Sequence, residues 1–307
     1  MRVRQLSARL RHPRGFVSLT TVLNRILGLL IAFFLLIENA CLGDLPGVKT
    51  VPTPTKTATH QDSTWKLVWS DEFDGQQGSP PNSSKWTSDV GGNGWGSHHL
   101  EYNTNNQNVY QDGQGNLVIE ARKDNPAGYQ CWYGTCQYTS ARITTRGFFS
   151  FTYGRIEARI KIPHDQGIWS AFWLLGSNCE TVGWPTCGEM DAMENIGSEP
   201  ATIHGSAHGP ENFTSSYKLQ QGAFADDFHI FKLQWDANHL YFFLDGDNYA
   251  ALNRASLEQQ QDWVYDHPFN IILNIAVGGD WPGSPSLTTV FPQKMSVSYV
   301  RVYNDKG

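Results

Sequence analysis

From Trp65 onward, the chain is a succession of short strand-like runs separated by Gly, Asn, Asp or Pro. In residues 154–162, the even-numbered positions are apolar or Gly and the odd-numbered positions are charged, which predicts a strand with one buried face and one solvated face. The runs of this kind are WKLVWSDEF, NLVIEAR, YGRIEARIKI, HIFKLQW, LYFFLDG, FNIILNIAV and VSYVRVY. Many short strands favour one all-β domain, a β-sandwich of two packed antiparallel sheets. The single modest helix candidate is RASLEQQQD, residues 254–262.

The composition limits the class of ligand. Aromatic residues make up 13% of the chain, with 11 Trp, and there are 29 Gly, which suits a turn-rich β-protein with an aromatic-lined groove. The net charge is −6. Nucleic-acid binding requires a basic face, so a nucleic-acid partner is not expected, whereas a neutral ligand such as a sugar is compatible with this charge.

The N-terminal residues are typical of an export signal. Arginines within residues 1–14 precede a 12-residue apolar run, residues 26–37, which is shorter than the roughly 20 residues of a membrane span. Small residues at Cys41 and Gly43 predict cleavage after Gly43 and a secreted or periplasmic protein. An uncleaved membrane anchor and a lipidated Cys41 are the alternatives. The predicted organisation is a signal peptide (1–43), a Pro/Thr-rich linker (44–62) and a single catalytic domain (63–307).

The cysteine count agrees with export. Removal of the signal deletes Cys41 and leaves four cysteines, and an even number in an exported chain suggests disulfides. Four cysteines allow three pairings, of which the two local ones are favoured; four free thiols are the alternative. No CxxC…CxxC spacing is present, so structural zinc is not expected. The favoured pairs are Cys131–Cys136 and Cys179–Cys187.

Residues 188–197, GEMDAMENIG, place three acids close together, at Glu189, Asp191 and Glu194. In a regular strand the first two share a face and the third lies on the other. An exposed acidic patch, a helix and a metal site are alternatives. The interleaved apolar residues disfavour the patch, the surrounding strands disfavour the helix, and the lack of an adjacent His disfavours the metal site. A β-bulge at Ala192–Met193 would instead return all three acids to one face.

On such a bulged strand, the carboxyl groups of Glu189 and Glu194 would approach to roughly 5–6 Å. Retaining glycosidases hold a nucleophile and a general acid/base about 5–5.5 Å apart. Asp191 between them would couple to both charges, and like charges this close raise a pKa and keep an acid protonated near neutrality. The motif therefore predicts sugar chemistry.

The stretch WPTCGEMDAMENIG, residues 184–197, resembles the active-site strand of glycoside hydrolase family 16, in the bulged E-x-D-x-x-E form of the laminarinases, which are endo-β-1,3-glucanases. The resemblance covers about residues 65–305 and includes WSDEFDG, NGWGSHHLEYNT, YTSARITTRGFFSFTYGRIEARIKIP, GIWSAFWLLG, DFHIFKLQW and FNIILNIAVGGDWPG. It implies a jelly-roll, concanavalin A-like sandwich with a concave substrate cleft. It also implies endo-acting, retaining hydrolysis of laminarin-type β-1,3-glucan, with Glu189 as nucleophile, Glu194 as acid/base and Asp191 as the assisting carboxylate.

Several aromatic residues are predicted to bind substrate, because flat sugar faces stack on Trp. Trp169 and Trp173 share strand parity, Trp184 precedes the nucleophile by five residues, and Trp281 lies in the GGDWPG stretch at the expected rim. Trp235 and Trp65 are predicted to be core residues. The family resemblance adds a further set of positions, Tyr102, Asn93 and Arg142 on the glycone side and His208 near the leaving group.

Two departures from the family pattern stand out. Ser97-His98-His99 occupies positions where laminarinases usually have two Asn and a Glu, which puts a glycone-side contact in doubt. Ser298 occupies a position where many members have an Asp that helps to hold a structural Ca²⁺, and a hydroxyl is a poor substitute for a carboxylate at such a site. No cofactor is expected for the chemistry, no catalytic metal is expected, and the calcium site is doubtful.

The expected partner is a polysaccharide, β-1,3-glucan, acted on by a monomer without a protein partner. Mixed β-1,3-1,4-glucan, an agar-type galactan and transglycosylation are alternatives within the enzyme class. A non-catalytic glucan-binding protein is an alternative of another class, disfavoured because Glu189, Asp191 and Glu194 are all present.

Overall fold

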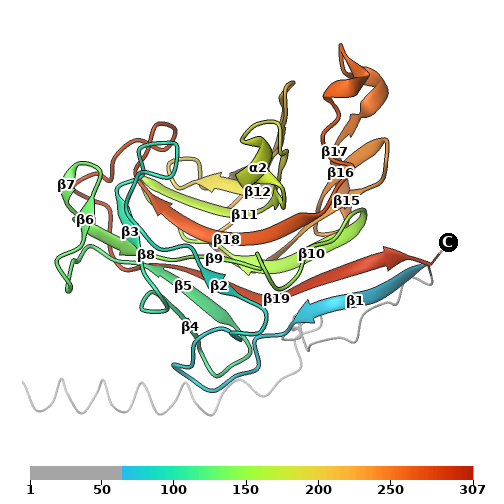
Figure 1. The fold of residues 1–307 in the computed structure, drawn as a ribbon. Coiled ribbons are helices and arrows are strands. Elements are labelled where there is room, and N and C mark those ends of the chain that lie inside the picture. The colour runs from blue at the N-terminus through green and yellow to red at the C-terminus, as the bar shows by residue number, and fades with distance from the viewer. Residues whose placement is uncertain (1–63, 307) are drawn as a thin grey trace, which may run out of the picture. The chain divides into compact units, whose positions relative to one another are not determined.

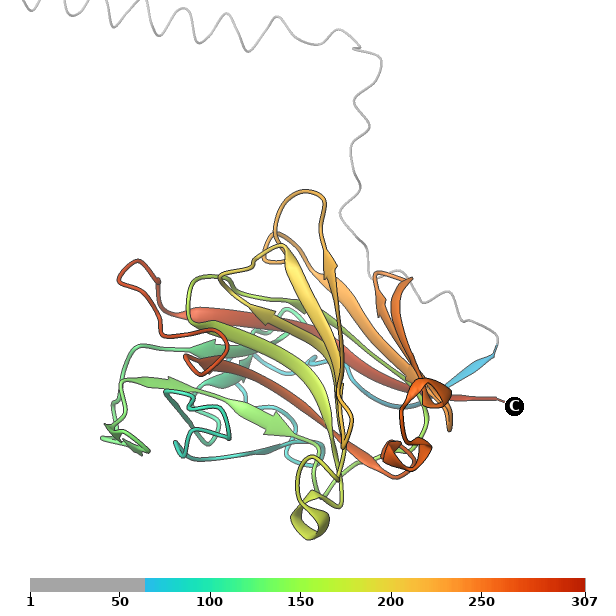
Figure 2. The ribbon, with the colours of Figure 1, turned by 90° about the horizontal axis from the view of Figure 1, so that it is seen from above.

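The computed structural model describes residues 64–306, which form a sandwich of two stacked antiparallel sheets (Figures 1 and 2). The expected signal segment, Cys41 included, and the expected linker lie outside the described residues. None of the helices in the described part is long and apolar enough to cross a membrane.

The first sheet has eight strands within residues 64–306, in the order β17-β16-β15-β10-β19-β5-β4, with β1 paired to β19. Its strands are β1 (Trp65–Asp71), β4 (Val109–Gln111), β5 (Leu117–Ala121), β10 (Gly154–Lys161), β15 (His229–Trp235), β16 (His239–Leu244), β17 (Asp247–Asn253) and β19 (Gln293–Asp305). All seven strand-like runs predicted from the sequence are strands, and FNIILNIAV coincides with β18 of the second sheet.

The second sheet has seven strands in the same part of the chain, in the order β14-β13-β12-β11-β18-β9-β2, and lies over the first in Figure 1. Its strands are β2 (Thr87–Ser88), β9 (Arg142–Thr144), β11 (Ile168–Gly176), β12 (Glu189–Ile196), β13 (Thr202–His208), β14 (Phe213–Lys218) and β18 (Phe269–Val277). Two small pairs complete the strands, the parallel pair β3 (Glu101–Asn103) and β8 (Tyr138–Ser140), and the hairpin β6 (Gln130–Cys131) and β7 (Gly134–Thr135). The predicted all-β jelly-roll architecture is confirmed.

The core fills the space between the sheets. In β10 every second residue is buried, as the alternation predicted, while the charged residues between them are half-buried on the outer face. Trp235 is 2% exposed and belongs to the core, as predicted. Trp65 does not: it is half-buried on the edge strand β1, where the Arg155 guanidinium lies 5.2 Å from its ring centre. An edge strand has one neighbour only, so its outer-face side chains receive less cover.

The helix prediction was wrong. Residues 254–262 form two 3₁₀ turns, η1 (Arg254–Ser256) and η2 (Gln260–Asp262), rather than one helix. The single α-helix of the described residues is a four-residue turn, α2 (Cys179–Val182), in the loop between β11 and β12. Residues 179 and 187 are joined by a disulfide that closes this loop, so the turn is fixed by a covalent constraint rather than by helical periodicity.

Strand β12 contains the predicted bulge. Against β11, Met193 pairs with Phe172 and Asp191 pairs with Trp173, so Ala192 has no partner of its own. Against β13, Asp191 pairs with Ser206 and Glu194 with His204, so three steps on β12 match two on β13. The extra residue resets the alternation of side chains beyond it.

Replacing Phe172 by Ala tests how strongly the core supports the strand beneath the bulge. Phe172 is fully buried, at 0% exposure, and truncating a buried Phe leaves a cavity. We expect the free energy of unfolding, measured by guanidinium denaturation, to fall by about 3–5 kcal/mol. The control is Val68→Ala, at a 42% exposed position of β1, which should change it by less than about 1 kcal/mol. Equal losses in the two variants would contradict this description of the core.

Candidate active site

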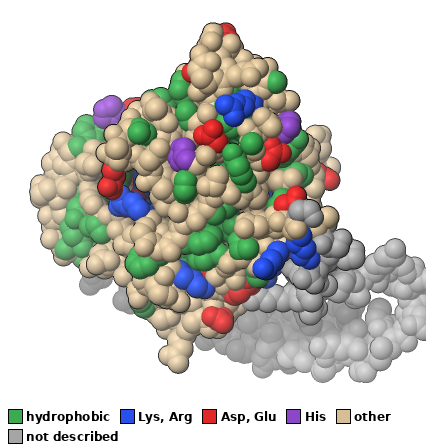
Figure 3. Space-filling view, turned by 45° about the vertical axis from the view of Figure 1, so that its right-hand side comes forward, with side chains coloured by type: hydrophobic (Ala, Val, Ile, Leu, Met, Phe, Trp, Pro, Cys, Tyr) green, Lys and Arg blue, Asp and Glu red, His purple; other side chains and the backbone are tan. Residues whose placement is uncertain are grey.

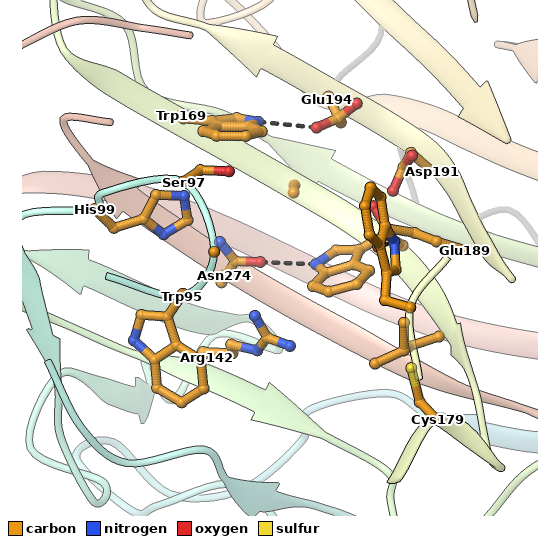
Figure 4. A pocket seen from close by; sticks show the side chains of 15 residues that line it. Trp95, Ser97, His99, Arg142, Trp169, Cys179, Glu189, Asp191, Glu194 and Asn274 are labelled. Atoms are coloured by element: carbon orange, nitrogen blue, oxygen red, sulfur yellow. Dashed lines mark hydrogen bonds between the residues drawn. The ribbon is translucent and has the colours of Figure 1, made fainter. Parts of the chain in front are cut away.

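A cavity of about 380 Å³ opens on the second sheet, above strands β9, β11, β12 and β18 (Figure 4). One wall is the loop of residues 95–99, and the other is the disulfide-closed loop of residues 179–187. The residues that line it are Trp95, Gly96, Ser97, His99, Arg142, Trp169, Ala171, Trp173, Leu175, Cys179, Trp184, Glu189, Asp191, Glu194 and Asn274.

All three acids of the motif face this cavity, as the bulge requires. Asp191 is 2% exposed and Glu194 is 8% exposed, so both carboxyl groups are largely withdrawn from water. Charged groups are seldom buried unless partners compensate them. The partners come from three neighbouring elements, each contributing nitrogen atoms that point at a carboxyl oxygen.

Indole groups donate to both glutamates. Trp169 Nε1 on β11 donates to Glu194 Oε1 at 3.0 Å, the upper dashed line in Figure 4. Trp184 Nε1, from the disulfide-closed loop, donates to Glu189 Oε2 at 3.1 Å. His208 on β13 places Nε2 3.3 Å from Asp191 Oδ2. Each acid therefore has its own nitrogen neighbour.

Burial raises the pKa of all three acids, but their surroundings separate them. The pKa of Asp191 is held well above its ordinary value by burial and by the neighbouring Glu189 charge. The pKa of Glu194 is also raised well above its ordinary value, by burial and then by the charges of Asp191 and Glu189. Both groups therefore favour the protonated form more strongly than exposed carboxyls do.

Glu189 differs because several neighbouring groups counteract the effect of burial on its pKa. Burial raises its pKa, while His208, Arg142 and the bond from Trp184 all act in the opposite direction. Of the three acids, Glu189 is thus the one best supplied with groups that stabilise a carboxylate. Carboxyls whose environments push their pKa values apart are typical of an acid and a nucleophile working together.

The cavity is lined with aromatic rings. Trp169 and Trp173 both face it from β11, as their parity predicted, and Trp184 stands at the wall with 59% of its surface exposed. Arg142 also lines it, with its guanidinium 4.9 Å from the ring centre of Trp95 and 4.7 Å from that of Trp173. Such a surface combines flat apolar faces with a fixed hydrogen-bond donor, which suits a sugar ring.

Ion pairs and disulfides hold the walls. Asp89 accepts from Arg142 at 3.0 Å and from Arg146 at 2.8 Å, and Arg146 also donates to Glu180 of the disulfide-closed loop at 2.7 Å. The structure contains both disulfides that the sequence favoured, Cys131–Cys136 and Cys179–Cys187. The loop that carries Trp184 is therefore closed on itself by a disulfide and linked by an ion pair to the segment that follows β9.

Four of the predicted binding residues are not among those that line the cavity. Trp281 is 41% exposed and packs perpendicular to Trp169, so it lies at the rim. His208 is the partner of Glu189 in the register of β12 and β13, so it lies beside the acids without being part of the lining. Tyr102 stacks on Tyr129, with ring centres 4.0 Å apart. Asn93 caps its own loop by accepting from the Trp95 backbone N–H at 3.1 Å. Substrate contacts of these residues remain predictions.

The lining residues that were not predicted as catalytic or substrate-binding include Trp95, His99 and Asn274. Trp95 and His99 belong to the quoted stretch NGWGSHHLEYNT, but nothing in their spacing aims them at the acids. Asn274 accepts from Trp173 Nε1 at 2.8 Å and orients that ring. The sequence did contain a pattern that could have identified Asn274, because an Asn inside the apolar run FNIILNIAV is unexpected unless it faces a polar site.

A metal does not fit the structure well at either candidate position. Ser298 is buried opposite β10 at a bulge of β19, and it offers a hydroxyl where calcium would need a carboxylate. In residues 64–306, the one close cluster of carboxylate and imidazole groups is Glu189, Asp191 and His208. Its oxygens already face the N–H of Trp184 and the Arg142 charge, and both disfavour a cation.

Charged side chains are interspersed on the face seen in Figure 3, where lysines and arginines lie among acidic groups rather than in one basic stripe. A basic stripe is the electrostatic footprint of nucleic-acid binding. The face in view does not carry such a stripe.

Comparison with known proteins gives consistent matches. The family model of glycosyl hydrolases family 16 matches residues 96–301. A beta-glucanase from Rhodothermus marinus is 38% identical over 257 residues, which cover 78% of this chain and 85% of that protein. The laminarinase catalytic domain from Thermotoga maritima is 45% identical with a TM-score of 0.74, over 80% of this chain and 100% of that one. An endo-beta-1,3-glucanase from Pyrococcus furiosus is 45% identical with a TM-score of 0.72, over 80% and 96% of the two chains.

Replacing Glu194 by Gln tests the cost of burying its charge. A carboxyl whose folded-state pKa is raised is harmless at low pH and destabilises the fold as pH rises through that pKa. We expect the variant to match the unmodified chain at pH 4 and to exceed its free energy of unfolding by about 1–3 kcal/mol at pH 8. The exposed Glu258→Gln variant, measured in the same denaturation series, should show no such gain. If the difference in free energy of unfolding between the two chains were the same at pH 4 and pH 8, the raised pKa of Glu194 would be contradicted.

Proposed function

The chain belongs to the glycosyl hydrolases of family 16, and we propose that its cavity hydrolyses internal β-1,3-glucosidic bonds of laminarin-type β-glucan with retention of configuration. The observation that carries this proposal is the bulged strand β12, which presents two buried carboxyl groups and the half-buried one of Glu189 to one aromatic-lined cavity. The laminarinase from Thermotoga maritima and the endo-beta-1,3-glucanase from Pyrococcus furiosus carry names that specify laminarin or β-1,3-glucan as the substrate.

In the first step, the Glu189 carboxylate attacks the anomeric carbon of the sugar. Glu194 donates its proton to the glycosidic oxygen, the carbon–oxygen bond breaks, and the shortened glucan leaves. A covalent glycosyl-enzyme at Glu189 remains. The raised pKa of Glu194 favours the protonated form that donates to the glycosidic oxygen. His208, Arg142 and the bond from Trp184 favour the carboxylate form of Glu189, which attacks.

In the second step, the deprotonated Glu194 takes a proton from water, and the resulting hydroxide attacks the same anomeric carbon. The bond to Glu189 breaks, its carboxylate is restored, and two inversions give net retention. Transfer to a second sugar follows the same route when a glucan hydroxyl replaces water.

Asp191 is suited to assist both glutamates. It lies between them on β12 and is hydrogen-bonded to Glu189. Burial and the Glu189 charge hold the pKa of Asp191 well above its ordinary value, so Asp191 favours the protonated form. A protonated Asp191 donates to Glu189 and stabilises the carboxylate that is about to attack.

The lining supports a long, uncharged chain as substrate. Trp169, Trp173, Trp184 and Trp95 come from three different segments, so several sugar rings can be stacked along one groove. This spread of aromatic rings over separate segments supports an endo mode of attack.

We further propose that the protein is exported after cleavage of the signal segment following Gly43. The two disulfides support this proposal, because such bonds persist in oxidising compartments. Intact mass measurement of protein recovered outside the cytoplasm should give a chain that begins at Asp44 and is lighter by the hydrogens of two disulfides. A mass that includes residues 1–43 would favour the anchored alternative, and a lipid adduct on Cys41 the lipoprotein.

Glu189→Gln tests the nucleophile. We expect kcat for the release of reducing ends from laminarin to fall by roughly 10³-fold or more, because Gln cannot form the covalent intermediate. Binding to insoluble β-1,3-glucan should persist, since the aromatic lining is intact.

Glu194→Gln tests the acid/base. We expect its kcat on laminarin to fall by about 10²–10⁴-fold, the range for removal of a general acid. The anomer first released by the unmodified chain, read by NMR, should be β.

A substrate panel separates the alternatives. The unmodified chain is assayed on laminarin, mixed-linkage glucan, agarose and cellulose. Fastest release of short oligosaccharides from laminarin supports the proposal. Activity confined to another polymer keeps the mechanism but overturns the substrate. Binding without cleavage of any polymer would make the chain a glucan-binding protein.

A further inference from the structure

His99 is one of the residues by which this chain departs from the family pattern, and it lines the cavity. It is 8% exposed, and its Nδ1 lies 3.5 Å from Glu101 Oε1. Glu101 is 1% exposed, and its other oxygen accepts the backbone N–H of Val277 at 2.8 Å. A buried histidine is thus paired with a buried carboxylate that is itself anchored at the end of β18.

The ring of His99 packs perpendicular to the indole of Trp169, with ring centres 5.2 Å apart and planes at 74°. Trp281 packs perpendicular to the same indole, also at 5.2 Å, and His204 packs on Trp281 at 4.9 Å. The Nε2 atom of His99 has no hydrogen-bond partner within residues 64–306. Ring packing is therefore what His99 contributes to this contact.

Trp169 needs such support because it projects from β11 into an open cavity, where the backbone alone does not fix its ring. Its Nε1 donates to Glu194 Oε1 at 3.0 Å, and rotation of the indole would break this bond. In Figure 4, His99 and Glu194 lie on different sides of Trp169. The contacts form a continuous series from Glu101 through His99 and Trp169 to Glu194.

We propose that His99, anchored by Glu101, is a positioning residue that holds the Trp169 indole at the angle at which it donates to Glu194. This inference rests on the proposed function, in which Glu194 is the acid/base. The His99–Glu101 pair then tunes the acid from the far side of an aromatic ring, without touching it.

The proposal has a specific pH signature. The other ionisable groups that face Glu194 are Asp191 and Glu189 on its own strand, His208 and His204 on β13, and Tyr249 on β17. An N–H donor favours the charged form of a carboxyl, so losing the Trp169 bond raises the pKa of Glu194. Because Glu194 must start protonated, the alkaline limb of kcat/KM moves to higher pH. The acid limb, set by Glu189, stays in place.

The test compares His99→Ala, His99→Phe and Glu101→Gln with a histidine control, His239→Ala, which is paired with Asp236 away from the cavity. Each variant is assayed on laminarin from pH 4 to pH 9, and its melting temperature is recorded. We expect His99→Ala to lose about 10-fold in kcat with a smaller change in KM, and to move the alkaline limb upward. His99→Phe should keep most of kcat because it retains the ring, and Glu101→Gln should fall between them.

A folded His99→Ala variant with unchanged kcat and an unchanged alkaline limb overturns the proposal, as does a change in KM alone. If His99→Ala does not fold, Glu101→Gln decides: an upward shift of its alkaline limb supports the proposal, and the unmodified profile overturns it. If the unmodified chain releases nothing from laminarin, the proposed function fails instead. The pKa of Glu194, followed by carboxyl ¹³C NMR and assigned with Glu194→Gln, then tests the positioning role without activity. It should rise in His99→Ala, and an unchanged value overturns that role.

Discussion

Three carboxyl groups lie close together on one bulged strand, with Asp191 and Glu194 buried and Glu189 half-buried, and the rest of the site is arranged around them. Burial and mutual repulsion both favour the protonated forms, and one group must still be ionised for the chemistry. The surrounding elements supply the hydrogen-bond donors and the positive charge that strand β12 lacks. Trp184, His208 and Arg142 stabilise the charge of Glu189, whereas Glu194 receives an indole bond and has two acidic neighbours. The asymmetry of these partners assigns different roles to two chemically identical side chains.

The sandwich makes this arrangement possible. A cavity floor of four neighbouring strands gives each side chain a direction set by register, and the first sheet buries the opposite face of those strands. The walls are loops, which the sheet alone would leave free. A disulfide and the bridge from Arg146 to Glu180 fix one loop, and a pair between His98 and Asp280 at 2.9 Å joins the other to the rim.

The pair formed by His99 and Glu101 lies next to Trp169, which in turn donates to Glu194. His99 belongs to the stretch that departs from the family pattern, and with Glu101 it meets the chemistry through Trp169. Substitution at such a distance changes the orientation of a catalytic group without changing its identity.

Local patterns in the chain were enough to predict seven strands, the sandwich, the two short-range disulfides and the bulge of β12, because each depends on alternation, spacing or chain separation. FNIILNIAV and GEMDAMENIG carry that information within ten residues. The short spans of α2 and the two 3₁₀ turns have too little periodicity to be predicted in this way. Folding in three dimensions was needed to bring Trp95, His99 and Asn274 to the acids, to stack Tyr102 on Tyr129, and to place His208 beside Glu189 and Asp191. These contacts join segments far apart in the chain, and their geometry depends on how the sheets curve and how the loops are tied, which no local pattern encodes.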